Sequence, residues 1–226
     1  INFAKWDLRV EPLPEVKGDA PSQGEFGGPS RDGPLVLPGD YTATVYANGK
    51  SIGSTSVSVR ADPESQISAA DRRANFEILR ELHALNGRLT AAVRATRQVN
   101  TQLGAIRKDL GDSTKVAADI RATLDSLGKQ IAPLKKKFFI QDEGEQVEFS
   151  AELFRSVVTF KLSGLAGNLS GFLTGASVQD QRALSEVRTE VPAALEETNA
   201  LVNRLASFVK HLAEAGLYPA VPKPVK

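Results

Sequence analysis

Cysteine and methionine are both absent from this sequence of 226 residues. Without cysteine the chain has no disulfide framework, no thiolate nucleophile and no zinc site of the usual cysteine type. Cysteine usage therefore does not indicate the redox compartment. Because the sequence begins at Ile1 without an initiator methionine, we expect an N-terminal portion of a longer protein to precede it.

An excess of charge of one sign is also lacking, since 28 Lys and Arg residues balance 27 Asp and Glu residues. The formal net charge of +1 gives no whole-protein field that would hold nucleic acid or an anionic membrane, so we expect no nucleic-acid partner. No run of about 18 apolar residues occurs, and none of the segments predicts a membrane span. The hydrophobic share of 41% is enough to bury a core.

The first part of the chain has the pattern of a small β module. Apolar and charged residues alternate over residues 4–10, as in a strand with one buried face, and this pattern predicts that Trp6, Leu8 and Val10 face inward. The stretch 12–34 is rich in Gly, Pro, Ser and Asp and predicts a long loop.

A β-hairpin is predicted next. Pro38 and Gly39 begin a turn, after which apolar residues alternate with polar ones, and Asn48-Gly49 is a two-residue hairpin signal because both positions of a type I′ turn need positive φ. The returning strand is expected at 51–60, which makes three or four strands in all. The predicted β core consists of Trp6, Leu8, Tyr41 and Val45.

Long amphipathic helices are predicted for the second part of the chain, with Ser68 as the N-cap of the first. Apolar or small residues recur there at steps of three and four, in stripes that are typical of coiled-coil seams. Such helices bury their stripes on one another, so we predict an antiparallel helical bundle of about four helices. The stripes are Ile78, Leu82, Leu85, Leu89, Ala92, Thr96, Val99, Leu103, Ile106 and Leu110; Val116, Ile120, Leu124, Leu127, Ile131 and Leu134; Val158, Leu162, Leu165, Leu169 and Phe172; and Leu184, Val187, Val191, Ala194, Thr198, Leu201, Leu205, Phe208 and Leu212.

Two prolines are expected to interrupt these helices. Pro133 and the lysines at 135–137 should end the second helix, and Pro192 should kink or divide the fourth, because proline lacks the backbone donor and crowds the preceding turn. The segment 138–151 has three alternative interpretations. It is a β-excursion, a loop that packs its aromatic residues on the bundle, or an exposed patch for a partner.

Three short motifs in the β module resemble a known family. The chain has Trp-Asp-Leu-Arg at 6–9, Pro-Gly-x-Tyr at 38–41 and Asp-Pro at 62–63. In this order they resemble the Ig-like module that follows the β-propeller in bacterial proteins of the sortilin-like, BNR-repeat "glycosyl hydrolase" family. The resemblance covers roughly the first 65 residues. The chain departs from the family pattern at Glu64, where Arg is expected, and lacks the family's preceding strands, which would lie before Ile1.

This resemblance and the periodicity together predict an α+β protein. We expect an Ig-like β module at 1–63, a helical bundle at 64–218 and a C-terminal tail at 219–226. The resemblance also implies a periplasmic or secreted protein, with a β-propeller region of the same precursor as a protein partner.

Residue types that carry catalysis or bind metal do not come together in the sequence. His83 and His211 lie far apart, and neither has a histidine or carboxylate at the i+4 spacing of a helical metal site. The acidic residues at 142–148 lack the spacing of a calcium loop. We therefore predict no catalytic residue, no cofactor and no metal, and expect that the chain is not an enzyme.

Three further motifs have structural interpretations that require no ligand. The glycines at 164, 167, 171 and 175 are not followed by the Lys-Ser/Thr of a phosphate loop and indicate close helix packing or a helix break. Asn168-Leu169-Ser170 matches a glycosylation acceptor within a predicted helical stripe. The lysines at 135–137 complement a helix dipole.

Three functions are compatible with these patterns. The chain is a non-catalytic region that packs on the propeller or binds a protein partner, an accessory region of a propeller enzyme whose active site lies outside this chain, or a self-associating coiled-coil module. The lack of a nucleophile, base and orienting group within one predicted cleft favours the first.

Overall fold

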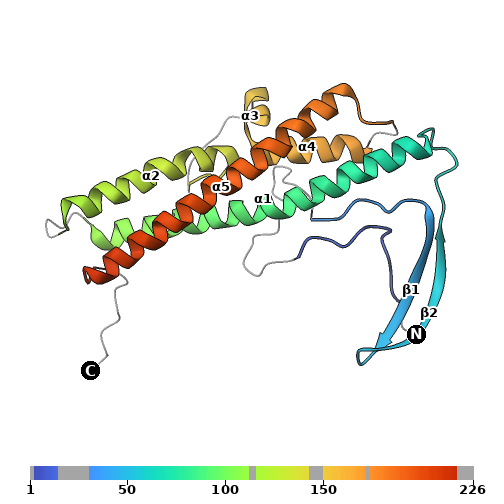
Figure 1. Cartoon of the computed structure of the whole chain (residues 1–226), viewed down its shortest axis with the longest axis horizontal. Helices are drawn as coiled ribbons and strands as arrows, with labels where there is room; N and C mark the ends of the chain where they lie inside the picture. The colour runs from blue at the N-terminus through green and yellow to red at the C-terminus, as the bar shows by residue number, and fades with distance from the viewer. Residues whose placement is uncertain (1–2, 15–30, 112–115, 143–149, 172–173, 218–226) are drawn as a thin grey trace. The chain divides into compact units, whose positions relative to one another are not determined.

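The computed structural model describes residues 3–14, 31–111, 116–142, 150–171 and 174–217. Its class is α+β, as predicted, because a two-stranded antiparallel sheet precedes a series of helices (Figure 1). The elements in chain order are β1 (Gly39–Ala47), β2 (Lys50–Val59), α1 (Ala69–Leu110), α2 (Ala118–Phe138), α3 (Ala151–Ser156), α4 (Val158–Gly171) and α5 (Val178–Glu214). Among the described residues, no helix is long and apolar enough to cross a membrane.

The chain divides into two compact units. The first unit comprises Ile1–Ala84 and Ser163–Ala183, and the second comprises Leu85–Leu162 and Leu184–Lys226. Helices α1, α4 and α5 each contribute residues to both units. A boundary between the predicted modules at residue 63 stays a prediction, and the predicted tail at 219–226 lies outside the described residues.

The hairpin of β1 and β2 has the turn that its sequence predicts. Asn48 and Gly49 both adopt positive φ, at 49° and 77°, as a type I′ turn requires. The two strands pair antiparallel from Gly39 opposite Val59 to Ala47 opposite Lys50. A register shift after Val45 leaves Ile52 of β2 without an opposing residue, so β2 carries a bulge there, whereas β1 is uninterrupted.

The strand predicted at residues 4–10 does not form. This segment makes only an isolated bridge between Arg9 and Leu35, with hydrogen bonds from Val10 N to Pro34 O (3.0 Å) and from Val36 N to Leu8 O (2.8 Å). Prolines at 12, 14, 34 and 38 supply no backbone N–H, which prevents the ladder from extending. Leu8 also has a φ of 60°, which is incompatible with a regular strand.

The predicted β core is therefore wrong for most of its members. Trp6 is 41% exposed, Leu8 42% and Val45 58%, while Tyr41 is half-buried. A core needs a second layer of structure over one face of the sheet, and two described strands with one bridge beside them do not supply that layer.

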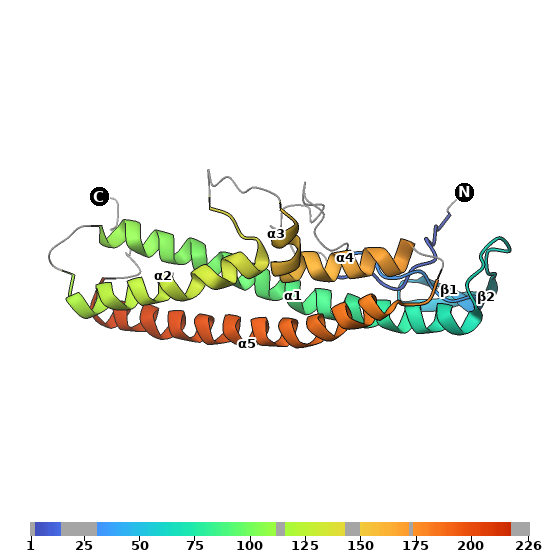
Figure 2. The same cartoon turned by 90° about the horizontal axis from the view of Figure 1, so that it is seen from above.

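The helical stripes are confirmed almost residue by residue. Every predicted stripe residue is buried except Ile78, which is half-buried, and Phe172, which lies outside the described residues. Within the second unit, α2 lies beside the α1 residues after 84 and the α5 residues after 183 in both views (Figures 1 and 2). The start of α1 is also as predicted, since Ser68 Oγ accepts a hydrogen bond from Asp71 N at 3.0 Å.

Pro133 does not itself end α2, although the helix ends directly after the predicted lysine run, and Pro192 does not divide α5. Helix α2 continues through Pro133 to Phe138, and α5 is one helix through Pro192. An interior proline costs about 3 kcal/mol, but burial of a large apolar side chain contributes about 1.5–3 kcal/mol. Because both Leu134 and Phe138 are buried after Pro133, the gain offsets the cost, and α2 ends only at Phe139, which is left-handed with a φ of 55°.

The segment after α2 begins as a packed connection. Phe138 and Ile140 are buried, and the ring of Phe139 lies 5.0 Å from that of Phe160, centroid to centroid. The short helix α3, capped by Ser150, was not predicted. Residues 143–149 lie outside the described part of the chain.

Candidate interaction surface

The two faces of the hairpin differ sharply in chemistry. Alternation and register place Tyr41, Ala43 and Val45 of β1 on one face, opposite Val57, Thr55 and Gly53 of β2. The other face carries Thr42 and Thr44 opposite Ser56 and Ser54. One face is thus largely apolar and the other is a layer of hydroxyl groups, as in a sheet that packs on a second layer through one side only.

A small part of the apolar face is covered, at its Tyr41 end. The rings of Trp6 and Tyr41 meet edge to face with centroids 5.3 Å apart, and the Tyr41 hydroxyl donates a hydrogen bond to Leu37 O at 2.6 Å. The Trp6 ring is itself held by a hydrogen bond from its Nε1 to Arg9 O at 3.1 Å. Val57 and Val59 are half-buried at this end of the hairpin.

The remainder of the hairpin, toward its turn, is uncovered. Ala43 and Val45 are exposed, and so are Tyr46 and the bulged Ile52, which is 66% exposed. Among the described residues, seven of the nine exposed large apolar side chains precede residue 53. These seven are Phe3, Trp6, Leu8, Leu35, Val45, Tyr46 and Ile52. Exposed large apolar side chains are therefore concentrated in the hairpin and in the segments that precede it.

The segment beside the hairpin is held in a fixed arrangement. Arg9 donates a hydrogen bond to Gly33 O at 2.9 Å, and Arg31 donates to Leu13 O at 2.9 Å. Gly33 is required there, because a Cβ at this position would lie 2.3 Å from Val10 O. These bonds join residues 8–13 to residues 31–36.

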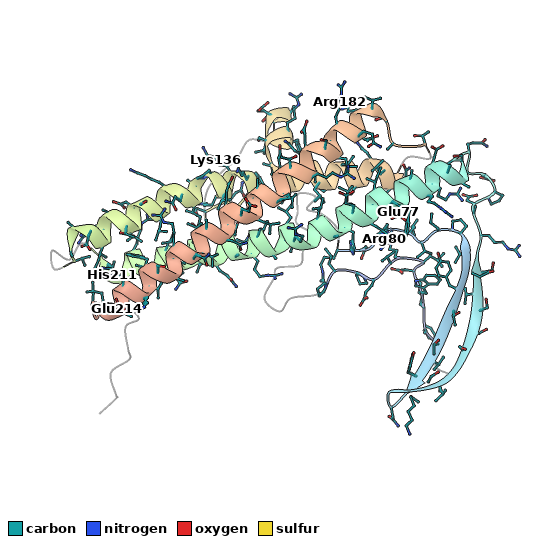
Figure 3. All side chains as sticks on the ribbon, viewed as in Figure 1. Glu77, Arg80, Lys136, Arg182, His211 and Glu214 are labelled. Atoms are coloured by element: carbon teal, nitrogen blue, oxygen red, sulfur yellow. The ribbon has the colours of Figure 1, made fainter. Side chains whose placement is uncertain are left out.

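The two histidines are in ordinary surroundings. His83 Nε2 lies 3.1 Å from Glu11 O in the first unit. In the second unit, His211 Nε2 lies 3.7 Å from Asp119 Oδ2, near the C-terminal end of α5, where Figure 3 also labels Glu214. Within the described ranges, no three His, Asp or Glu residues are grouped as a metal site would require.

Lys135, Lys137 and Asp142 all form ion pairs within the second unit. Asp142 accepts hydrogen bonds from Lys135 and from Asn100 Nδ2, the latter at 3.0 Å, and these bonds lower the pKa of its carboxyl. Lys137 contacts Glu197 at 2.6 Å, while Lys136 near the end of α2 is exposed (Figure 3). The other acidic residues of the predicted cluster, at 143, 145 and 148, lie outside the described residues.

Lys161 also has a shifted pKa. Burial lowers the pKa of its ammonium, but hydrogen bonds to Glu190 at 2.6 Å and Glu186 at 3.4 Å outweigh burial, so the pKa is raised. Lys161 is therefore charged at neutral pH and ties α4 to α5 within the second unit, which is a structural role.

Two glycines of α4 do not mark the close helix packing that was predicted for them. Gly164 and Gly167 lie on the helix with no neighbouring atom within 4 Å of an added Cβ. A polar hollow of about 250 Å³ adjoins the C-terminal end of α4, and none of its lining residues is basic. They are Asn168, Leu169, Thr174, Gly175, Ser177, Gln179 and Asp180.

Two groups in this hollow already have partners. The Ser177 hydroxyl and main-chain N–H both bond to Asp180 Oδ2 at the start of α5, at 2.7 and 2.9 Å. Asn168, the predicted glycosylation acceptor, is exposed on α4. The hollow has the chemistry of a capped helix start beside a loop.

No family model, no curated protein and no solved structure matches the chain. Similarity to a known protein therefore adds nothing to what the geometry of this surface indicates. Sequence patterns located the hairpin and its apolar residues, but they did not indicate that these residues are uncovered. The bulge at Ile52 was also missed, although Gly53 follows it and Ile52 is out of phase with the alternating Val57 and Val59.

Proposed function

We propose that the chain is a non-catalytic interaction region of an exported β-propeller protein. In this proposal an Ig-like module and an antiparallel helical bundle form a unit that packs on the propeller of the same precursor. The observation that carries the proposal is the uncovered apolar face of the hairpin around Val45.

The chemistry of the hairpin supports the Ig-like assignment. In such sandwiches each sheet buries one face on the other and exposes a polar face to solvent. The Tyr41 face of the hairpin is apolar and its Thr42 face is polar, but a second sheet is lacking among the described residues. A partner that is itself rich in β-structure would supply the missing layer.

The long helices support a structural role for the rest of the chain. The buried stripes of α1, α2 and α5 are continuous, and Asp142 and Lys161, whose pKa values are shifted, are engaged in ion pairs. Continuous stripes of this type are the packing pattern of an antiparallel bundle. The helices would then supply structure rather than chemistry to the region.

Two substitutions on neighbouring residues test the proposed binding face. Val45→Asp places a charge on the apolar face, and Thr44→Asp places the same charge one residue away on the hydroxyl face. Full burial of a valine contributes about 1.5 kcal/mol, which is about tenfold in Kd. We expect Val45→Asp to weaken binding of the precursor's propeller region at least tenfold, and Thr44→Asp to change it less than about threefold.

Isothermal titration of the chain with the separately produced propeller region gives both affinities. Equal effects of the two variants would show that the apolar face is not the binding surface. Failure of the unsubstituted chain to bind would refute the proposed partner.

A further inference from the structure

We infer that β1 pairs edge to edge with β1 of a second copy of this chain. The result is a continuous antiparallel sheet with the strand order β2-β1-β1-β2. This inference goes beyond the proposed function, since it uses the main-chain edge of β1 and not the apolar face of the hairpin.

The edge of β1 is open. Among the described residues, its main chain hydrogen-bonds only to β2, in a sheet of two strands. All residues of β1 except Tyr41 are exposed. The N–H and C=O groups that point away from β2 therefore form a row that another strand can pair with.

This edge also lacks the features that usually prevent such pairing. Natural edge strands carry lysines, prolines or bulges. Strand β1 contains no proline and no basic residue, and its single charge, Asp40, lies near one end. By contrast, β2 has Lys50 at its start and the bulge at Ile52. The edge available for strand addition is therefore that of β1.

The sequence of β1 is complementary to itself. A twofold axis through Ala43, the middle residue of Gly39–Ala47, lets all nine residues pair with those of the second copy. Tyr41 then lies opposite Val45, and Thr42 opposite Thr44, which are aromatic with β-branched and Thr with Thr pairs, both favourable across strands.

Two further features specify this register. Partners about Ala43 have numbers of the same parity, so the apolar faces of both copies lie on the same side of the sheet. Asp40 lies opposite Tyr46, so no charge opposes its own copy. Moving the axis by one residue to Thr42 or Thr44 leaves part of the strand unpaired.

The pairing has a structural benefit for the hairpin. An isolated two-stranded hairpin is marginally stable in water, whereas three or more strands with one apolar face are stable. Pairing two copies gives four strands and one continuous face that contains Tyr41, Ala43 and Val45 from each copy. A second copy therefore supplies what the described part of a single chain lacks.

Single cysteines provide a direct test, because the chain has no cysteine of its own. In the proposed pairing, Ala43 lies opposite Ala43 of the second copy, with Cα atoms about 4.5–5.5 Å apart, within the range of a disulfide. Thr55 is the residue opposite Ala43 in the hairpin and is equally exposed. Its Cα lies roughly three strand spacings, or about 14 Å, from its copy, too far for a disulfide.

We expect mild oxidation of Ala43→Cys to give a covalent dimer on a non-reducing gel, and that of Thr55→Cys to leave the chain monomeric. Equal cross-linking of the two variants would overturn the inference. So would sedimentation of the unsubstituted chain as a monomer across its accessible concentration range.

A charge-swap experiment gives an independent answer. Ala43→Lys and Ala43→Glu each place like charges opposite each other in a homodimer, so each variant alone should sediment as a monomer. A mixture of equal parts should restore the dimer, which also shows that both variants keep a folded hairpin. A mixture that stays monomeric, or variants that stay dimeric alone, would overturn the inference. Neither result depends on the propeller partner.

Discussion

The substitution Leu103→Ala measures how much the buried stripe of α1 contributes to the free energy of unfolding of the second unit. This side chain is 1% exposed and lies in the middle of a run of buried residues from Val99 to Leu110. Leu→Ala substitutions in such positions cost about 2–5 kcal/mol, and the cost is highest where the surroundings cannot collapse into the cavity. Because the neighbouring stripe residues Val99 and Ile106 are also buried, we expect a loss of about 3 kcal/mol.

Urea unfolding followed by far-UV circular dichroism reports this loss. With an m value of about 2 kcal/mol/M, the expected destabilisation lowers the midpoint by about 1.5 M. Leu103→Asp should go further and unfold the unit in buffer, because a buried, unpaired carboxylate adds about 3–5 kcal/mol or more.

The matched control is Thr101→Ala, an exposed position two residues earlier in the same helix. Surface substitutions of this kind change stability by less than about 0.5 kcal/mol. If Leu103→Ala and Thr101→Ala unfold at the same urea concentration, the stripe does not form the core and the packing described for the second unit is refuted.

Two other predictions follow from local contacts. The hydrogen bond from Lys135 lowers the pKa of Asp142 in the folded state, so its stabilising contribution is present above about pH 4, the unfolded value, and is lost as the pH falls through the lower, folded value. Asp142→Asn should therefore destabilise the chain more at pH 7 than at pH 2, as measured by urea midpoints; equal losses at both pH values would contradict this. Gly33→Ala forces a Cβ to within 2.3 Å of Val10 O and should speed tryptic cleavage after Arg9, whereas Gly53→Ala, with open space around the Cβ, should not. Identical digestion rates would show that the close approach at Gly33 is unimportant.

The helices were predictable because their signals are local. A period of three and four residues identifies the buried face whatever that face contacts, and the stripe from Leu82 to Leu110 is buried as its spacing requires. The turn at Asn48-Gly49 and the cap at Ser68 are local in the same sense, since each depends on residues within one turn.

The β segment at residues 4–10 was mispredicted because a strand depends on a partner elsewhere in the chain. Alternation around Trp6 and Leu8 describes a surface that would suit a sheet, but the segment that could pair with it contains Pro34 and Pro38. The end of α2 was predicted more closely, because the lysines at 135–137 lie in its last turn. Pro133 alone does not end the helix, which continues through the buried Leu134 to Phe138.

The sequence predicted only part of the candidate surface. The apolar residues Tyr41 and Val45 could be assigned to one face by alternation, but their exposure depends on which other strands cover that face. An uncovered face and an open edge are properties of the assembled fold, and no local pattern distinguishes them from a buried core.

The scarcity of charged side chains on the hairpin affects how fast a partner can bind it. Apart from Asp40 in β1 and Lys50 in β2, the two strands carry no ionisable side chain other than tyrosine, so the middle of the hairpin carries no charge at neutral pH. Long-range charge attraction is what raises association rates above about 10⁶ M⁻¹s⁻¹ and makes them depend on salt. A partner that docks on the middle of this hairpin would gain little from charge attraction there, and its association rate should change only slightly between dilute buffer and concentrated salt.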